Sequence, residues 1–555
     1  MPNKELKGQL MDVIRNDNTA RMRRDVFTPM VQLVIQDISG KKQVEIEKII
    51  NTAIKKFGLL KCKIDFGKLS DKEIRQLGCE INKKISEKIC LYTSKFSNVE
   101  LLSALVRLSG LLSYLTLEMY YPSTREDFLE RSVYKGHVFQ DIIAFMAQAI
   151  RSAEIHGQYD GSQLLGGLKA SVELGINQIL KGELSSANCN QYENLHLLEL
   201  MNLWTAQVQL SNIFDSLIIA GSLRKGLILE EGKLPEVPMS VSTAFSKYAE
   251  DTKSYSIKIH RKAHNKALKR FKEIVGYSPD DFRRYLEDDN KVFQMNNFAT
   301  ILDDGFLETE LELKKIVPHK GAKRLVSDIT LNNQEFYVHG KNALDYMSDP
   351  NFRFFRSPLI RIEGKILTSP ITMVEVTEKL RLRVLSRSFQ IEEGANFNEV
   401  AKINFDEESL PKIKKALQNI GVKALTDFDI GRNPFTKLVM QNKRGIPHQL
   451  DLCYVKQGEL SIWDLKNYEL QHSYIEFERL KNKITKEVAK LRKLKIEVLK
   501  NKAIFEQAFG VEFKTVSLGI MTVDPSAYPY LIENKNNKVK VTSVNDFIQN
   551  LVANT

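Results

Sequence analysis

Apolar residues recur every three or four positions from the start of the chain to about Asp303, a spacing that lines one face of an α-helix. Three stripes show it most clearly: Leu101, Leu102, Leu105, Leu108, Leu111 and Leu112; Ile142, Ile143, Phe145, Met146 and Ile150; and Leu197, Leu198, Met201 and Trp204. Stripes of this kind are typical of buried helix faces rather than of ligand sites. We therefore expect residues 1–315 to form one or two α-helical domains.

The pattern changes after about residue 316. Segments 328–340 and 357–370 each resemble two strands around a turn, and segment 380–386 alternates like a short strand. We interpret residues 316–387 as a small β-rich connector, or equally as an N-terminal extension of a following sheet. Because 555 residues exceed what one hydrophobic core serves, we expect a multidomain protein that ends in an α/β domain at 388–555.

The chain is basic, with a formal net charge of +12. Such a surplus favours a polyanionic partner such as nucleic acid, or an anionic membrane surface, although charge alone also aids solubility. The apolar stretch 101–121 contains Arg107 and Glu118, so we expect a buried helix rather than a membrane span. The N-terminus lacks an apolar signal core, and the five scattered cysteines include no C-x-x-C pair. These features predict a cytoplasmic protein with no membrane partner.

The most informative segment is 446–469, which reads as a β-hairpin with a tight turn at 456–458. Asp464 and Lys466 are two positions apart on the second strand, so they share a face. Counting back across the turn places Asp451 opposite Asp464 to within a residue. Two carboxylates and one ammonium group are therefore expected to converge.

This set of groups suits phosphodiester hydrolysis. Paired carboxylates bind Mg²⁺ or Mn²⁺, and the metal polarises the phosphate and lowers the pKa of a bound water. A neighbouring lysine can orient or deprotonate that water, or stabilise the pentavalent phosphorus of the transition state. Two buried carboxylates without a cation would be costly, which also favours a metal at this position.

These residues resemble the PD-(D/E)XK nuclease superfamily, with the match D451 … D464-L-K466. The resemblance implies a C-terminal restriction-endonuclease-like core of order αβββαβ, and metal-dependent cleavage of DNA or, less often, RNA. It also implies a further acid on the preceding helix, which we assign to Glu399 on an expected helix at 395–405. Catalysis would then use Asp451, Asp464, Lys466 and Glu399, with the three acids as metal ligands.

Later segments fit the same core: a helix from about 472 to 502, a strand at 514–524 and a covering helix at 543–552. Two features depart from the family pattern. Pro447 stands four residues before Asp451 rather than beside it, and Gln449 occupies a position where an acid would be unsurprising. The second departure puts a second metal site in doubt.

Two basic segments are candidate phosphate-binding faces. Residues 474–502 carry ten basic and four acidic side chains, a surplus equal to half the net charge of the chain. A second basic segment follows a proline-containing linker at 231–242, and its His260 and His264 lack a local third metal ligand. The predicted nucleic-acid contacts are Lys481, Lys483, Lys486, Lys490, Lys262, Lys266, Lys269 and Arg270.

The main functional hypothesis is a DNA endonuclease with a helical N-terminal module that senses a trigger, recognises the nucleic-acid substrate or binds a protein partner. Its layout is that of a bacterial or phage-related defence nuclease, and DNA is favoured over RNA as substrate. The alternatives are an RNA-directed nuclease of the same core, a nucleic-acid-binding scaffold with an inactive core, and a helical adaptor for acidic proteins. The oligomeric state stays open.

Overall fold

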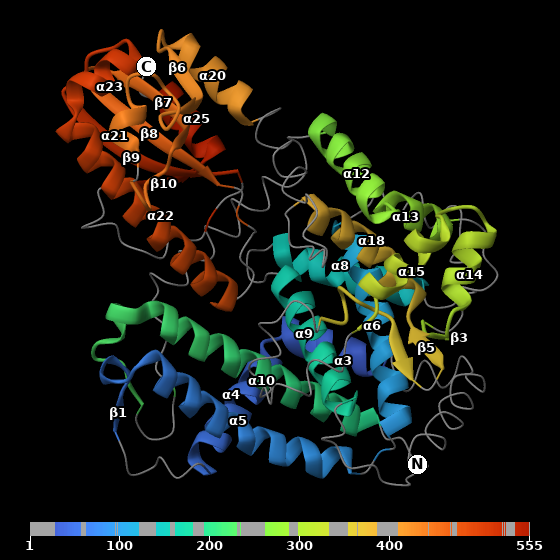
Figure 1. Cartoon of the computed structure of the whole chain (residues 1–555). Helices are drawn as coiled ribbons and strands as arrows, with labels where there is room; N and C mark the ends of the chain where they lie inside the picture. The colour runs from blue at the N-terminus through green and yellow to red at the C-terminus, as the bar shows by residue number, and fades with distance from the viewer. Residues whose placement is uncertain are drawn as a thin grey trace. The chain divides into compact units, whose positions relative to one another are not determined.

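The computed structural model describes residues 28–56, 63–94, 98–120, 140–155, 161–180, 194–229, 261–287, 298–331, 353–362, 364–385, 409–441, 443–466, 474–523 and 539–553, with residues 96, 234, 468, 526 and 528. The chain divides into two compact units (Figure 1). The first comprises Met1–Val237 and Val275–Arg381, and the second comprises Pro238–Ile274 and Leu382–Thr555.

Helices dominate the first unit, as the apolar stripes predict. They are α3 (Thr28–Ile38), α4 (Lys41–Lys56), α5 (Asp71–Thr93), α6 (Asn98–Tyr120), α8 (Gln140–Ile155), α9 (Gly161–Leu180), α10 (Asn194–Ala220), α13 (Pro279–Glu287), α14 (Phe306–Leu313), α15 (His319–Asp328) and α18 (Pro370–Leu385), with short 3-10 helices at Phe66–Lys68 and Gly221–Arg224. Helix α10 packs against α3, α4, α5 and α9, and its side chains are buried on most sides. It is therefore the central helix of this bundle.

Local signals explain where such helices begin. Ser70 caps α5: its hydroxyl accepts a hydrogen bond from Glu73 N, and Ser70 N donates one to the Glu73 carboxylate. Helix α6 contains Glu100–Met119, a window apolar enough to span a membrane, but 89% of that window is buried inside the protein. The expectation of a buried helix is confirmed for this segment.

Two small sheets complete the first unit. Strands β1 (Ile64–Asp65) and β2 (Ile228–Leu229) pair antiparallel. Strands β3 (Thr300–Asp303), β5 (Lys365–Thr368) and β4 (Ile360–Ile362) form the other sheet in that order. The hairpin predicted at 357–370 is confirmed as β4 and β5, and its sheet is separate from the C-terminal one.

One prediction for this region is wrong. Residues 380–385 of the segment predicted as a strand are the end of helix α18, because the helix that begins at Pro370 continues through them. Of the strand pair predicted at 328–340, Asp328 ends helix α15, and Thr330 forms an isolated β-bridge with Leu359. The rest of that pair, from residue 332, lies outside the described residues.

The second unit contains helices α12 (Arg261–Val275, all but its last residue), α20 (Leu410–Asn419), α21 (Lys437–Met440), α22 (Tyr474–Lys500), α23 (Lys502–Phe509) and α25 (Val544–Ala553). Its strands are β6 (Ala424–Asp429), β7 (Gln449–Lys456), β8 (Glu459–Lys466), β9 (Thr515–Thr522) and β10 (Val539–Ser543). They form one mixed sheet in the order β10-β9-β8-β7-β6 (Figure 1). Strands β6, β7 and β8 are antiparallel, whereas β8, β9 and β10 run parallel.

Apolar cores cover both faces of this sheet. On one face, Cys453, Leu460, Ile462 and Leu518 pack with the apolar stripe of α22 and with α23. On the other, Leu452, Trp463 and Leu465 pack with α20 and α25. Gly519 lies beside Trp463 in register, and a Cβ there would meet the indole ring at 2.1 Å, so this position admits no side chain.

The later sequence predictions for this unit agree with the structure to within a few residues: α22 matches the helix at 472–502, β9 the strand at 514–524 and α25 the helix at 543–552. Strands β6 and β10 and helices α20 and α23 were not predicted individually. The helix expected at 395–405, with Glu399, lies outside the described residues.

Candidate active site

The hairpin β7–β8 positions the candidate residues. Its two-residue turn, Gln457-Gly458, has positive φ at both positions (53° and 75°), which matches the twist of antiparallel strands. Lys456 is thus the last residue of β7 rather than part of the turn. The register pairs Lys456 with Glu459 and Leu452 with Trp463. Continued by one residue, it sets Asp451 opposite Asp464, as the sequence predicted.

Alternation along the strands decides which face these side chains occupy. Leu460 and Ile462 belong to the core that α22 covers, so Asp464 and Lys466, two and four residues further, point to the same side. Asp451 shares the face of Cys453 in β7. All three candidate side chains therefore lie on the α22 side of the sheet.

Direct contacts hold the three groups together. The Asp451 carboxylate accepts a hydrogen bond from Leu465 N through Oδ2 at 2.7 Å. Lys466 Nζ lies 2.8 Å from Asp464 Oδ1. The other Asp464 oxygen, Oδ2, is buried and has no hydrogen-bond partner among the described residues while both aspartates are ionised, whereas a protonated Asp451 side chain can hydrogen-bond to Asp464. An unsatisfied buried carboxylate oxygen is costly unless a proton or a cation reaches it.

The protonation of these groups follows from their surroundings. Burial, and then the negative charge of Asp464, raise the pKa of Asp451 to about 7. Burial works to lower the pKa of Lys466, but Asp464, with help from Asp451 and Glu487, outweighs it and leaves that pKa above its ordinary value. Lys466 is consequently a cation at neutral pH, suited to binding negative charge rather than to accepting a proton.

Two further residues adjoin the site that the sequence analysis did not single out. Glu487 of α22 is close enough to influence the pKa of both Lys466 and Tyr468. Burial, and then the charges of Asp464 and Glu487, raise the pKa of the Tyr468 phenol well above its usual range. Glu487 could have been found, because it falls in phase with the buried stripe Ile484, Val488 and Leu491, and an acid there must face the sheet.

A fourth carboxylate lies on the neighbouring strand. The side chain of Gln449 donates a hydrogen bond to Asp427 Oδ1 at 3.3 Å. Asp427 lies within β6 but has a φ of 51°, which is uncommon for a residue other than glycine, and its side chain is exposed. Gln449 occupies the β7 position where an acid would be unsurprising. Asp427 of β6 lies beside that position and supplies an acid.

The donor set fits a hard divalent cation. Asp451 and Asp464 supply carboxylate oxygens, the ligands that Mg²⁺ and Mn²⁺ prefer, and the unpartnered Asp464 Oδ2 is available for one. Within the described part of the chain, no three His, Cys, Asp or Glu side chains are grouped closely enough to hold a metal by themselves. Mg²⁺ ordinarily keeps several waters and uses one or two carboxylates, so two suffice.

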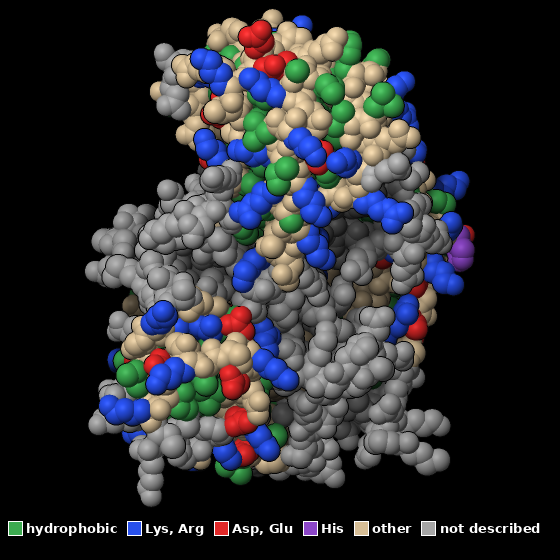
Figure 2. All heavy atoms as spheres, turned by 60° about the vertical axis from the view of Figure 1, so that its left-hand side comes forward, with side chains coloured by type: hydrophobic (Ala, Val, Ile, Leu, Met, Phe, Trp, Pro, Cys, Tyr) green, Lys and Arg blue, Asp and Glu red, His purple; other side chains and the backbone are tan. Residues whose placement is uncertain are grey.

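The predicted phosphate contacts are only partly described. On α22, Lys483, Lys486 and Lys490 are exposed and Lys481 is half-buried, with Lys490 Nζ 2.8 Å from Glu487 Oε1. Figure 2 shows Lys and Arg side chains gathered along this helix.

The second basic segment forms helix α12, as predicted. Lys266 and Lys269 are exposed, and Arg270 pairs with Glu273 at 2.8 Å. The side chains of Lys262 and His264, and all of His260, lie outside the description.

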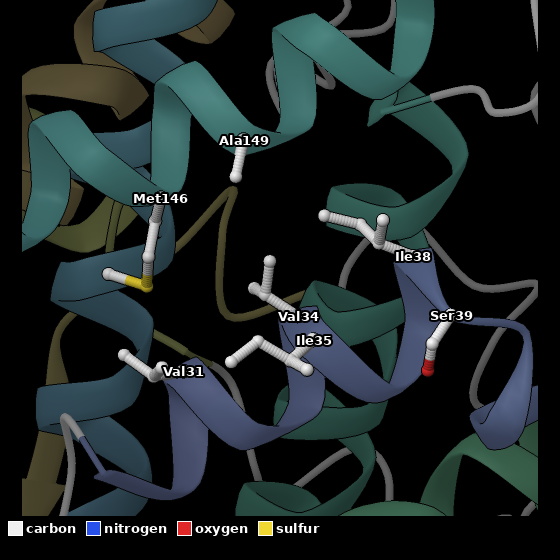
Figure 3. Close-up of a pocket in the computed structure, with 7 residues that line it drawn as sticks. All are labelled: Val31, Val34, Ile35, Ile38, Ser39, Met146 and Ala149. Carbon is white, nitrogen blue, oxygen red and sulfur yellow. The ribbon is translucent and has the colours of Figure 1, made fainter.

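The first unit contains an apolar pocket. A pocket of about 270 Å³ between α3 and α8 is lined by apolar side chains such as Val34, Ile35 and Met146, with Ser39 at its edge (Figure 3). It offers no titratable group for chemistry.

The first unit also contains a buried ion cluster. Lys169 Nζ of α9 and Lys379 Nζ of α18 lie 2.6 Å and 2.7 Å from Glu375 Oε1. Burial would raise the pKa of Glu375, but the two lysines outweigh it and hold that pKa at about 2. Burial lowers the pKa of Lys169 to about 8, although Glu375 opposes the change. The cluster joins α9 to α18.

In comparisons with known proteins, the chain matches no family model, no curated protein and no solved structure.

Proposed function

We propose that the second unit is a metal-dependent nuclease of the PD-(D/E)XK type that hydrolyses phosphodiester bonds in DNA. The observation that carries this proposal is the pair of buried carboxylates, Asp451 and Asp464, that share a single lysine, Lys466, which contacts only one Asp464 oxygen. The buried Glu375 of the first unit also has one oxygen without a hydrogen-bond partner among the described residues, but its other oxygen contacts two lysines. At Asp451 and Asp464 the carboxylates outnumber the cations, so a proton or a metal ion is needed to balance them.

The order of elements supports the same proposal. Helix α20, strands β6, β7 and β8, helix α22 and strand β9 occur in the order αβββαβ that the resemblance implies, with the short helices α21 and α23 inserted after β6 and α22. The acidic hairpin occupies the second and third strands of this series. Helix α20 differs from the expected first helix, because its described sequence LPKIKKALQN contains no acid. A contribution from Glu399 thus remains a separate prediction.

The residues present assign roles as follows. Asp451 and Asp464 would hold Mg²⁺ or Mn²⁺, which when bound polarises the phosphate and lowers the pKa of an attacking water. The hydrogen bond from Leu465 N fixes the Asp451 carboxylate in place. Lys466, protonated at neutral pH, donates hydrogen bonds to a phosphate oxygen and offsets the charge that develops in the transition state.

The basic face of α22 supports a nucleic-acid substrate rather than a small phosphoester. Its exposed lysines are available to contact successive phosphates, with DNA favoured over RNA. We further propose a cytoplasmic location, and a defence role in which the helical first unit senses a trigger or binds a protein partner. The alternative of an inactive scaffold is less well supported, because Asp451, Asp464 and Lys466 are all present, Lys466 contacts Asp464, and both act on the charge of Asp451.

The test is a cleavage assay on duplex DNA, single-stranded DNA and RNA with Mg²⁺ or Mn²⁺. We expect Asp464→Asn and Lys466→Ala each to lower the rate at least about a hundredfold, because each removes a group that acts mainly in the transition state. Glu459→Gln and Lys456→Ala, at the turn end of the same hairpin, are matched controls and should retain activity. Cleavage without metal, or full activity of Asp464→Asn, contradicts the proposal.

A further inference from the structure

The connection between β6 and β7 has a charge pattern of its own. Residues 430–448 include Arg432, Lys437, Lys443 and Arg444 but no acid. The connection, here called the β6–β7 loop, ends at His448, three residues before Asp451. It therefore leaves the sheet at the end where the two carboxylates stand. Any strand of nucleic acid that reaches Asp451 and Asp464 approaches this loop.

The loop is held firmly by its own contacts. Asp429 Oδ1 accepts hydrogen bonds from Gly431 N and Arg432 N, both at 2.9 Å. Asn433 Oδ1 accepts one from Phe435 N at 2.9 Å. The buried Thr436 hydroxyl donates to Ile430 O at 2.6 Å. Side-chain turns of this kind fix the backbone locally.

Two buried side chains anchor the loop to the domain core. Ile430 and Met440 are fully buried in the cluster that α22 covers. Lys443 pairs with Glu497 of α22 at 3.0 Å. The loop and the basic helix are thus parts of one surface. Side chains that the loop exposes are displayed at fixed positions rather than on a free tail.

The loop exposes two large apolar side chains among its cations. Phe435 is 45% exposed and Leu438 is 72% exposed, whereas the nearby Met440 is buried. The exposed Arg432, Lys437 and Arg444 lie along the same loop. A single exposed apolar residue needs no explanation. An exposed aromatic ring set among cations next to a phosphodiester site is the combination used to bind unpaired bases.

We propose that the β6–β7 loop binds an unpaired stretch of nucleic acid beside the active site, with bases on Phe435 and Leu438 and phosphates on Arg432, Lys437 and Arg444. This inference rests on the proposed nuclease function and specifies its substrate as single-stranded or locally unpaired. The reason is steric. In a duplex the faces of the bases are covered by their neighbours, so a phenyl ring stacks only on bases that are unpaired or at an end.

The experiment measures binding with cleavage removed. Full-length protein carrying Asp464→Asn is titrated in EDTA against a labelled single strand of about 15 nucleotides, the range that such sites cover. The same sequence is used as a duplex. Three further variants are compared in that background: Phe435→Ala with Leu438→Ala, Lys437→Gln with Arg444→Gln, and Val511→Ala. Val511 is the matched control, since it is an equally exposed apolar residue (43%) elsewhere in the unit.

We expect the apolar double variant to weaken single-strand binding at least about tenfold while duplex affinity changes less than about twofold. The cationic double variant should weaken binding to both the single strand and the duplex. It should also reduce the slope of log affinity against log salt concentration by the amount expected for about two lost phosphate contacts. Fluorescence of 2-aminopurine in the strand should be quenched by Asp464→Asn protein and not by the apolar double variant. Val511→Ala should match the parent.

Equal affinity of the apolar double variant and its parent overturns the inference. So does an equal loss on single strand and duplex, or retained quenching, because each shows that bases do not stack on the loop. Failure of the nuclease proposal looks different: wild-type protein then cleaves none of the polymers, whatever its affinity for single strands. Thermal melting of each variant confirms that the fold is intact.

Discussion

Each unit of the chain contains a buried cluster of charges, and the two clusters differ in how they are neutralised. In the first unit Glu375 contacts two lysines, Lys169 and Lys379, at one of its oxygens. In the second, Asp451 and Asp464 share one lysine, Lys466. The first cluster has a cation in excess of its carboxylate, whereas the second has a carboxylate in excess of its cation.

The difference teaches what each cluster is suited to do. Because two lysines of the protein offset the charge of Glu375, the first cluster fastens α9 to α18 without an external cation, although Glu375 Oε2 has no hydrogen-bond partner among the described residues. The second remains incomplete until a proton or a cation arrives, and its own lysine is already engaged. Buried carboxylates that lack internal compensation are characteristic of functional sites rather than of structural ones. The comparison makes opposite predictions for apparently similar substitutions.

The largest expected effect is on the stability of the first unit. Glu375→Gln leaves Lys169 and Lys379 without their partner, and we expect a loss of about 3–5 kcal/mol in the free energy of unfolding. Hydrogen exchange of peptides from α9 and α18, followed by mass spectrometry, measures this locally. Glu87→Gln is the control: Glu87 forms an exposed pair with Lys84, and its loss should cost less than about 1 kcal/mol. An unchanged exchange rate for Glu375→Gln would contradict the structural role.

A divalent cation should stabilise the second unit alone. At a Mg²⁺ concentration about one hundred times the dissociation constant, the expected gain is about 2.7 kcal/mol. Exchange in β7 and β8 should slow, while exchange in α9 and α18 stays the same. Asp464→Asn should abolish the response. Equal protection of both units by Mg²⁺ would show a nonspecific salt effect and break the comparison.

The pH dependence of the two clusters should have opposite sign. The pKa of Glu375 lies below its ordinary value of 4.5, so its contribution is present above pH 4.5 and is lost as the pH falls towards 2. The pKa of Asp451 lies above its ordinary value of 3.8, so without metal its contribution is present below pH 3.8 and is lost as the pH rises through about 7. Each slope is at most about 1.4 kcal/mol per pH unit.

Hydrogen exchange at a series of pH values, corrected for the intrinsic exchange rate, separates the two units. Glu375→Gln should remove the acid-side slope from the first unit only. If the second unit instead becomes more stable between pH 4 and 7 in EDTA, the result contradicts a like-charged pair of Asp451 and Asp464.

The smallest expected effect is on the metal-free second unit. Asp464→Asn removes one of two neighbouring negative charges, so stability in EDTA should be unchanged or should rise by up to about 1 kcal/mol. The same substitution abolishes cleavage under the proposed function. A loss of several kcal/mol in EDTA would instead class this cluster with the one around Glu375.

How much of this was predictable depended on local signals. The hairpin and the pairing of Asp451 with Asp464 follow from an alternating pattern and a short turn, both readable in the sequence. Strand β6 was not predicted, because Asp427, which has a positive φ, interrupts the alternation of apolar and polar residues. The segment at 380–386 was wrongly predicted as a strand, because residues 380–385 belong to a helix that begins at Pro370.

Long-range contacts were beyond sequence reasoning. Lys169 and Glu375 are 206 positions apart, and nothing in either neighbourhood indicates the other. Glu487 is an intermediate case. Its phase on α22 predicts that it faces the sheet, but its distance from Lys466 depends on how the helix crosses β8.

The Gln457-Gly458 turn has a consequence for how the unit can evolve. Asp464 stands six residues beyond it, about 20 Å along the strand. An inserted residue at the turn that shifted the pairing by one position would send Asp464 and Lys466 to the opposite side, among the apolar side chains of α20 and α25. The length of this two-residue turn therefore fixes the face of the sheet on which Asp464 and Lys466 lie, and we expect variation in length to be tolerated in the β6–β7 connection sooner than here.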